Sequence, residues 1–385
     1  MDANTTMDVP TLSMIEFQDY IENDIPVSIY LTILSVIGTV GNVHAVFVYF
    51  LRYKPSNHRT FVVWLAAIDF IACLFSIPFE LFDIRFSCTF TIDGLCRFFR
   101  YLGHFVSMSS GSLLGVIAVE RFRKACRPFD RQLEGRGAMI ACIVTVVISA
   151  VISIPALVMY GSQVEIVDNY DINGTDCKVL DKFKDSLVFK GFNLLLLFIS
   201  TAVFIACVVI YIFIGRVLYQ QYKFRSSLQV KKSVSTVMDK SVSSDTLHTM
   251  QEEESSMANP VMSRTKIFGQ NGDKPMKIKP KNPKRFDRSK QITLMFLVAT
   301  GVSYLGYLPS LILTLIKAAS KNSNNVIDSL LGPVGGIFLR GYFISNVTNP
   351  LVYCFLDDKF REECKAMYKI LGMRISKCFH RPSSR

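Results

Sequence analysis

The chain has 385 residues, of which half are apolar and only 19% are charged. A soluble protein with so few charged residues would struggle to cover its surface with polar groups. The net charge is +12, but the basic residues lie in short segments between apolar runs and form no single stripe, which argues against a nucleic-acid groove. This composition predicts a membrane protein with no nucleic-acid partner.

The first 24 residues carry six acidic residues and no lysine or arginine. They lack the basic start and the short apolar core of a cleavable signal peptide. We therefore expect residues 1–24 to form an extracellular N-terminus and the first apolar run to act as an uncleaved anchor. Two glycosylation sequons would lie outside the cell, at Asn4 and at Asn173.

Seven apolar stretches follow, and each is long enough to cross the hydrocarbon core of a bilayer, which takes about 20 residues. They are Ile25–Phe50, Phe61–Phe82, Cys96–Val119, Ala138–Tyr160, Leu187–Ile214, Ile292–Ile316 and Val326–Phe355. These stretches predict an all-α membrane protein built as a bundle of seven transmembrane helices.

Charge in the connecting segments predicts the orientation of the bundle. The segments after the first, third, fifth and seventh stretches are basic, whereas the N-terminus and the segment after the fourth are acidic. Because cytoplasmic loops carry an excess of lysine and arginine, the N-terminus should be extracellular and the C-terminus cytoplasmic. We expect residues 1–24 to lie outside the cell, residues 25–225 to contain spans one to five, and residues 291–356 to contain spans six and seven. Between them, residues 226–290 should form a disordered third cytoplasmic loop, and residues 357–385 should form an amphipathic helix and a cytoplasmic tail.

Polar side chains inside the apolar stretches are costly in a bilayer, so each is a functional candidate. Asp69 lies in the middle of span two, and four further polar residues lie in spans one, three and seven: Asn42, Ser110, Asn346 and Asn349. If these groups face one another, they form a small polar pocket suited to a sodium ion or a proton. The alternative is a structural hydrogen-bond cluster, worth about 1 kcal/mol per bond. We favour the ion pocket for Asp69 and expect no other cofactor.

Four short motifs occur in order along the spans: Gly41-Asn42, Leu65-Ala-Ala-Ile-Asp69, Glu120-Arg121-Phe122 and Asn349-Pro-Leu-Val-Tyr353. Each motif alone is common, but the ordered set resembles the signature of rhodopsin-like (class A) G-protein-coupled receptors. The surrounding sequence resembles divergent invertebrate-type orphan receptors near the neuropeptide group. The resemblance covers all seven spans and implies a short amphipathic helix after the seventh.

The resemblance implies a switch at the cytoplasmic ends of the helices. Arg121 would be held by Glu120 at rest and released toward a G protein on activation. Tyr211 and Tyr353 would then move toward Arg121, and a proline kink would let the inner half of span six swing outward. The implied switch residues are Glu120, Arg121, Tyr211, Pro309, Asn349, Pro350 and Tyr353.

The resemblance also implies a disulfide between Cys96, at the outer start of span three, and Cys177, after span four. Both cysteines would lie on the oxidising side of the membrane, where disulfides persist. Cys378, beyond the amphipathic segment, is a candidate for palmitoylation, and a plain cytosolic thiol is the alternative.

Two ligand classes do not fit the spans. Span seven has no lysine that could bind retinal as a Schiff base, and Gly103 occupies the position where the resemblance places the aspartate of amine receptors. Charged and polar groups instead gather at the outer end, where the expected ligand contacts are Glu80, Arg100, His104, Tyr307 and Arg340. They could pair with the charges of a peptide, or Glu80 could simply neutralise Arg100 or Arg340.

The sequence therefore predicts a plasma-membrane receptor for an extracellular ligand, with a peptide as the leading hypothesis and a non-peptide small molecule as the alternative. Its expected partners are a heterotrimeric G protein, arrestin, receptor kinases and membrane lipids. An enzyme is not predicted, because the sequence has no His-Glu-x-x-His motif, no phosphate loop and no Cys-x-x-Cys. A transporter or a channel is disfavoured, because the sequence has no internal repeats and no pore-lining polar stripe.

Overall fold

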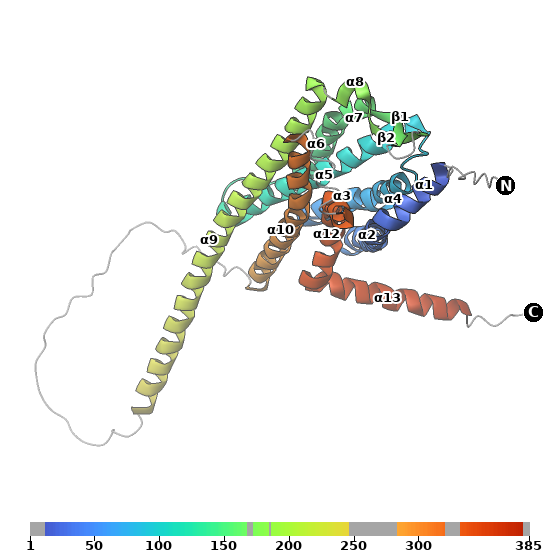
Figure 1. Cartoon of the computed structure of the whole chain (residues 1–385). Coiled ribbons are helices and arrows are strands. Elements are labelled where there is room, and N and C mark those ends of the chain that lie inside the picture. The colour runs from blue at the N-terminus through green and yellow to red at the C-terminus, as the bar shows by residue number, and fades with distance from the viewer. Residues whose placement is uncertain (1–11, 168–171, 185, 246–282, 320–331, 380–385) are drawn as a thin grey trace, which may run out of the picture. The chain divides into compact units, whose positions relative to one another are not determined.

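The computed structural model describes residues 12–167, 172–184, 186–245, 283–319 and 332–379, which are helical apart from one β-hairpin and short connections (Figure 1). The chain falls into two compact units, of which one comprises Met1–Ile214 with Lys290–Arg385 and the other comprises Gly215–Ser289. The candidate sites lie in the first unit.

The first two spans are each a helix that contains a π turn. In the first, α1 (Leu12–Asp19), η1 (Tyr20–Asp24) and α2 (Ile25–Arg52) follow without a break. The second has the same order, with α3 (Asn57–Ile71), η2 (Ala72–Ser76) and α4 (Ile77–Arg85). In both cases a proline, Pro26 or Pro78, stands in the first turn of the helix that follows. Proline has no N–H and its ring crowds the preceding turn, so a wider turn before it relieves the clash.

The third and fourth spans lead into a hairpin. Span three is α5 (Asp93–Cys126), and span four is α6 (Gly135–Ser153) with α7 (Pro155–Met159). The acidic segment after them forms the antiparallel strands β1 (Tyr160–Val167) and β2 (Ile172–Val179), in which Ser162 pairs with Cys177. The short α8 (Asp181–Lys184) then leads toward span five. The hairpin was not predicted from the sequence.

The helices α9 (Leu187–Asp245) and α10 (Pro283–Ala319) contain spans five and six. The predicted disorder of 226–290 differs from the structure at both ends, because 226–245 continues α9 and 283–290 begins α10. Residues 246–282 lie outside the described part. The stretch 226–245 contains no glycine or proline, and lengthening an existing helix needs no new nucleus, so α9 can extend through a polar sequence.

Span seven is divided by a short 3₁₀ turn. A helical segment at 332–339 is followed by η3 (Gly341–Phe343), α12 (Ile344–Leu356) and the amphipathic α13 (Asp358–Phe379). Among the described residues, six helices are long and apolar enough to cross a membrane, one for each of spans one to six. The seventh does not qualify by length, because η3 interrupts it and 320–331 lies outside the described residues.

The backbone of η3 touches α10 at a pair of glycines. A Cβ added at Gly341 would lie 2.6 Å from the carbonyl oxygen of Gly306, which is closer than real Cβ contacts. We expect Gly341→Ala to push the two backbones apart at a cost of about 1–3 kcal/mol, seen as a lower melting temperature of the purified protein. The control is Gly301→Ala on α10, where a Cβ meets nothing within 4 Å. An equal melting temperature for both variants would contradict this contact.

The helices carry apolar residues on their outer surface and polar residues inside. In α6 the side chains of Ile140, Val147 and Val151 are exposed, whereas Ser149 and Ser153 are buried and donate hydrogen bonds to carbonyl oxygens of their own helix. This reverses the pattern of a helix on the surface of a soluble protein and suits a helix surrounded by lipid. The largest apolar core lies between α2, α3, α5, α6, α10, α12 and the start of α13.

Candidate functional site

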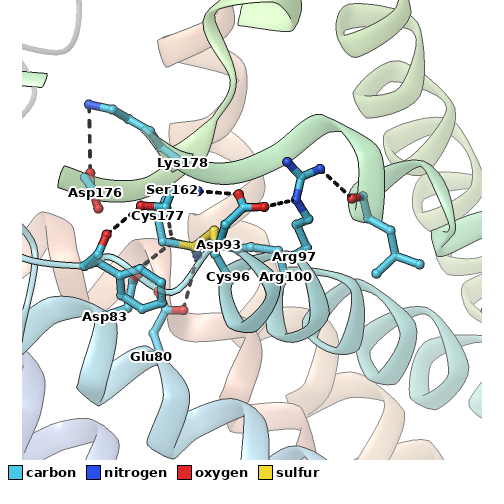
Figure 2. The surroundings of a disulfide bond; sticks show 12 residues. Glu80, Asp83, Asp93, Cys96, Arg97, Arg100, Ser162, Asp176, Cys177 and Lys178 are labelled. Atoms are coloured by element: carbon cyan, nitrogen blue, oxygen red, sulfur yellow. Dashed lines mark hydrogen bonds and ion pairs between the residues drawn. A yellow bond between two sulfur atoms is a disulfide. The ribbon is translucent and has the colours of Figure 1, made fainter. Parts of the chain in front are cut away.

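A disulfide joins Cys96, near the start of α5, to Cys177 in β2, as the resemblance implied (Figure 2). Beside it, Asp93 accepts a hydrogen bond from the backbone N–H of Ser162 at 3.0 Å and forms an ion pair with Arg97 at 2.7 Å. The hairpin is therefore fixed to the outer end of α5.

Four charged side chains form an outer cluster next to this disulfide: Glu80, Asp83, Arg100 and Arg340. Arg100 lies between the two carboxylates, with Nη2 donating to Asp83 Oδ2 at 2.6 Å and Nη1 lying 3.5 Å from Glu80 Oε2 (Figure 2). Arg340 Nε donates to Glu80 Oε1 at 3.1 Å. Arg100 Nη2 also donates to the carbonyl oxygen of Cys177 at 2.9 Å, which connects the outer cluster to the hairpin.

Three of the five predicted ligand contacts, Glu80, Arg100 and Arg340, thus meet in the outer cluster, where Asp83 supplies the second carboxylate. The other two have different neighbours. The ring of His104 packs near the rings of Tyr160 and Phe192, with centroids 5.9 and 5.6 Å away. Tyr307 lines a cavity deeper in the bundle.

This cavity has a volume of about 70 Å³ and lies between α5, α9, α10 and span seven. Hydroxyl groups line it from every side, among them those of Ser107, Ser200, Tyr307 and Ser345, and no charged side chain belongs to its described lining. Ser110, midway along α5, also lines it and donates a hydrogen bond to Asp69 at 2.8 Å. The cavity therefore reaches the polar pocket that the sequence predicts.

The five polar residues predicted to share that pocket do lie together. Asp69 accepts hydrogen bonds from Ser110 Oγ at 2.8 Å, Asn346 Nδ2 at 2.8 Å and Asn349 Nδ2 at 2.6 Å. Asn42 Nδ2 donates to the backbone carbonyl oxygen of Asn346 at 2.8 Å. All five side chains are buried, so hydrogen bonds in the interior connect spans one, two, three and seven.

The oxygen atoms of this pocket suit a singly charged cation. Asp69 supplies one carboxylate, and the side-chain oxygens of Asn42 and Asn349 are buried without a hydrogen-bond partner in the described part of the chain. Such oxygens are the ligands that hard cations bind. Within the described ranges, no group of three or more His, Cys, Asp or Glu side chains could hold a metal ion.

At the inner end of α5, Arg121 and Glu120 form a buried ion pair, with Arg121 Nε 2.7 Å from Glu120 Oε2. Two residues that sequence reasoning did not assign also hold Glu120. Lys124 Nζ lies 2.5 Å from Glu120 Oε1, and Asn57 Nδ2 donates to the same oxygen at 3.3 Å. The guanidinium of Arg121 lies 5.6 Å from the ring centroid of Phe296 on α10, so Arg121 is enclosed between the two helices.

The two tyrosines of the implied switch have other neighbours in this structure. The hydroxyl of Tyr211 lies 3.4 Å from that of Thr300 on α10. Tyr353 is fully buried, and its ring meets that of Tyr49 edge-on, with centroids 5.6 Å apart.

The two prolines of the implied switch lie inside helices, Pro309 in α10 and Pro350 in α12. Each removes one backbone hydrogen bond and crowds the preceding turn, which makes a helix easier to bend at that point. A Cβ at Gly41 would lie 2.9 Å from Cγ of Pro350, so the Gly41-Asn42 motif permits the close packing of α2 against α12.

Asp357, between α12 and α13, was not predicted as a functional residue. Its Oδ2 accepts hydrogen bonds from the hydroxyls of Tyr49 and Tyr53, both at 2.8 Å, and its Oδ1 accepts from the backbone N–H of Phe360 at 3.2 Å. Burial alone would raise the pKa of Asp357, but the nearby His58 and the hydrogen bonds from Tyr49 and Tyr53 outweigh burial and hold the pKa well below its usual value. Asp357 thereby fixes α13 to α2 and α3.

The helix α1 was not predicted either. Glu16 is buried, and its Oε1 accepts hydrogen bonds from the backbone N–H groups of Cys88 at 2.8 Å and Thr89 at 3.1 Å. Thr89 in turn pairs with Thr175 of β2. As a result, α1, the loop after α4 and the hairpin form one connected outer rim.

Of the three predicted modification sites, only Asn173 has a side chain within the described part of the structure. Asn173 is exposed on β2, where a glycan would find space. Asn4 lies outside the described residues, and Cys378 lies in α13 at a position whose side chain is outside the described part.

A bundle of membrane-spanning helices with a buried polar interior, a disulfide-fixed outer rim and an enclosed arginine at its inner end defines a multi-pass membrane protein. The chain belongs to the 7 transmembrane receptor (rhodopsin family) group, which it matches over residues 41–353. This membership confirms the resemblance and the predicted fold class. It also agrees with the prediction that the chain is not an enzyme, because the family is one of receptors.

The chain is similar to cephalotocin receptor 2 of Octopus vulgaris, at 27% identity over 189 residues, which make up 48% of this chain and 42% of that protein. This match spans less than half the length of that relative. The chain is also 24% identical to cholecystokinin receptor type A of Homo sapiens over 356 residues, covering 86% of this chain and 77% of the human protein. For the cholecystokinin receptor of Xenopus laevis the identity is 24% over 344 residues, covering 86% and 74%.

Proposed function

We propose that this chain is a receptor for an extracellular peptide and that it activates a heterotrimeric G protein. The relatives named as receptors for cephalotocin and cholecystokinin support a peptide ligand. The observation that carries the signalling step is the buried Glu120–Arg121 pair at the inner end of α5. When Arg121 leaves this pair, Glu120 keeps its ion pair with Lys124, so release of the arginine does not strand a buried charge.

Activation begins with an outward swing of the inner half of α10 about Pro309. Phe296, which lies against the guanidinium of Arg121, moves with this half of the helix and uncovers the arginine. The contact between Tyr211 and Thr300 on α10 breaks in the same movement, which frees the tyrosine to turn toward Arg121. The space that opens receives a helix of the G protein, and arrestin and receptor kinases act at the same cytoplasmic face.

The peptide binds at the outer cluster, and the disulfide beside the cluster supports placing this end outside the cell. Because Glu80 and Asp83 pair with Arg100 and Arg340, a ligand that enters must offer charges of its own to replace these pairs. A peptide can do so with its side chains and termini. An uncharged small molecule cannot, so the outer cluster favours a charged ligand.

Affinity selection from a pooled peptide library tests the ligand class. The purified chain is incubated with the pool, and retained peptides are identified by mass spectrometry. We expect Glu80→Gln to retain at least about tenfold less than the unchanged chain, because the basic groups of a bound peptide lose the Glu80 carboxylate as their counter-charge. Asp181→Asn, an exposed carboxylate in α8, should retain the same peptides as the unchanged chain. Binding of uncharged small molecules with no retained peptide would refute the peptide hypothesis.

We further propose that the pocket around Asp69 holds a sodium ion. Sodium chloride should raise the melting temperature of the purified chain above its value in choline chloride at equal ionic strength. At tenfold excess over the dissociation constant the gain is about 1.4 kcal/mol, or a few degrees. Asp69→Asn should remove this difference, because an amide carries no charge to hold the ion, and Glu362→Gln on exposed α13 serves as control. The same sodium response in Asp69→Asn would leave the pocket as a structural hydrogen-bond cluster.

A further inference from the structure

Three of the last carbonyl oxygens of α12 accept hydrogen bonds from side chains outside that helix. The final carbonyls of an α-helix have no partner within the helix and need one elsewhere. Those of Cys354 and Phe355 accept from the guanidinium of Arg361, which belongs to the following α13. The carbonyl oxygen of Leu356 instead accepts from Nε2 of Gln291 at 2.8 Å. One end of span seven is therefore capped by a side chain of span six.

The same amide group of Gln291 makes a second bond. Its Nε2 also donates to Oδ2 of Asp358, in the first turn of α13, at 2.9 Å. A side-chain amide has two N–H donors, so each of these acceptors can take one. We call the two bonds from Gln291 to Leu356 and to Asp358 the inner latch. The inner latch joins the inner end of α10 to the junction between α12 and α13.

The inner latch lies far from the proline about which α10 is proposed to bend. Gln291 stands 18 residues before Pro309, a distance of about 27 Å along a helix. A bend of about 5° at Pro309 would therefore move Gln291 by roughly 2 Å. A bond of 2.8 Å stretched by that amount lies well beyond the roughly 3.2 Å limit of ordinary N–H···O bonds. The inner latch therefore opposes even a small outward movement of α10.

The acceptors of the inner latch are held by other contacts and cannot simply follow α10. Asp357 fixes the start of α13 to α2 and α3, and Arg52 at the end of α2 pairs with Glu363 of α13 at 2.8 Å. An outward movement of α10 must therefore break the bonds of Gln291. The side chain of Asp358 is 66% exposed, so water can replace the amide there, and the restraint can be released.

We propose that Gln291 is a positioning residue, which holds the inner end of α10 against the α12–α13 junction while no ligand is bound. The inference rests on the proposed function, because that function takes the outward swing of α10 as the activating step. Its consequence is that Gln291 limits the signalling that the chain produces without a ligand.

Second-messenger output without a ligand, corrected for the amount of chain at the cell surface, measures this consequence. We expect Gln291→Leu, which keeps the size of the side chain and removes both donors, to raise this output about three- to tenfold. Gln291→Lys should restore the output of the unchanged chain, because an ammonium group can donate to both acceptors. A purely structural role of Gln291 would not be rescued by a charged side chain.

Fluorine NMR measures the position of α10 without any G protein. Leu294 lies on α10 one turn beyond Gln291 and is 50% exposed, so 4-trifluoromethylphenylalanine can be introduced there in the full-length chain in detergent micelles. We expect the fraction of the open form to rise at least about threefold in Gln291→Leu and to stay unchanged in Gln291→Lys. Asp358→Ala removes one of the two bonds and should give a smaller rise.

The matched control is Gln220→Leu, which makes the same substitution at an exposed glutamine of α9 and should change neither measurement. Equal fluorine spectra for the unchanged chain and Gln291→Leu would overturn the inference, even if the chain signals to a peptide. Spectra that shift as expected, with no second-messenger output from any variant, would support the inner latch and count against the proposed function. The two proposals therefore fail separately.

Discussion

Replacing Arg121 with alanine is expected to abolish G-protein signalling while the chain still folds and reaches the cell surface. The guanidinium is the group that the proposed opening of α10 uncovers, so its removal takes away the contact with the G protein. Folding should survive, because Lys124 Nζ lies 2.5 Å from Glu120 Oε1 and keeps that buried carboxylate paired. Second-messenger output should fall by more than about tenfold, which corresponds to at least 1.4 kcal/mol in the coupling equilibrium.

The matched control for this change is Arg127→Ala, six residues further along the chain and just beyond the end of α5. The side chain of Arg127 is 65% exposed and pairs with the exposed Asp130, so its loss should leave signalling unchanged. Surface labelling of the intact cells establishes that all three proteins are present in equal amounts. Undiminished output from Arg121→Ala would remove Arg121 from the switch.

Replacing Cys177 with serine is expected to reduce delivery to the cell surface several-fold. The disulfide closes a loop between residues 81 positions apart, and a link of that span stabilises a fold by about 4.5 kcal/mol in the chain-entropy account. Its loss also frees β2, whose carbonyl oxygen at Cys177 accepts a hydrogen bond from Arg100 of the outer cluster. Flow cytometry of intact cells with a tag on the N-terminus, which the sequence predicts to be extracellular, measures the surface fraction.

The matched control for the disulfide is Cys88→Ser in the loop after α4. Cys88 is a half-buried free thiol on the same side of the membrane, so its replacement tests loss of a cysteine without loss of the disulfide. We expect this variant to reach the surface normally. A Cys177→Ser protein with normal surface levels would show that the hairpin does not depend on its covalent link.

The pocket around Asp69 was predictable from the sequence because its members are polar residues in apolar stretches. Such residues must find partners inside the bundle, since lipid offers none. Asp69, Ser110 and Asn349 were therefore expected to meet, and the structure brings them within hydrogen-bonding distance. This reasoning uses only the cost of a polar side chain in lipid. It therefore predicts that the polar residues meet without knowledge of how the helices are arranged.

Glu16 and Asp357 were not predictable by the same reasoning, because both lie outside the apolar stretches. Water is available there, and nothing in the local pattern says that a carboxylate will be buried. Their partners are also far along the chain, 72 residues away for the Glu16–Cys88 bond and 308 for the bond between Tyr49 and Asp357. The one local signal is that Asp357 stands just before an amphipathic segment, which favours a helix cap at this residue. This signal does not predict that Tyr49 and Tyr53 will donate hydrogen bonds to Asp357.

The outer cluster was only partly predictable from the sequence. The sequence placed Glu80, Arg100 and Arg340 at one end of the bundle but left open whether they would meet a ligand or one another. That choice depends on the relative rotation of the helices, which determines whether Arg100 reaches Asp83 and Glu80. In the structure the side chains pair with one another, so a ligand has to compete with these pairs.

The central claim is that the chain transmits binding of an extracellular peptide to a G protein through Arg121. Second-messenger output from cells that express the chain tests it most directly, with a peptide library and reporters for several G proteins, and with Arg121→Ala cells in parallel. The account predicts a peptide that produces a signal with the unchanged chain and none with Arg121→Ala. Silence of the unchanged chain at the cell surface across all peptides and reporters, or an equal signal from Arg121→Ala, would contradict it.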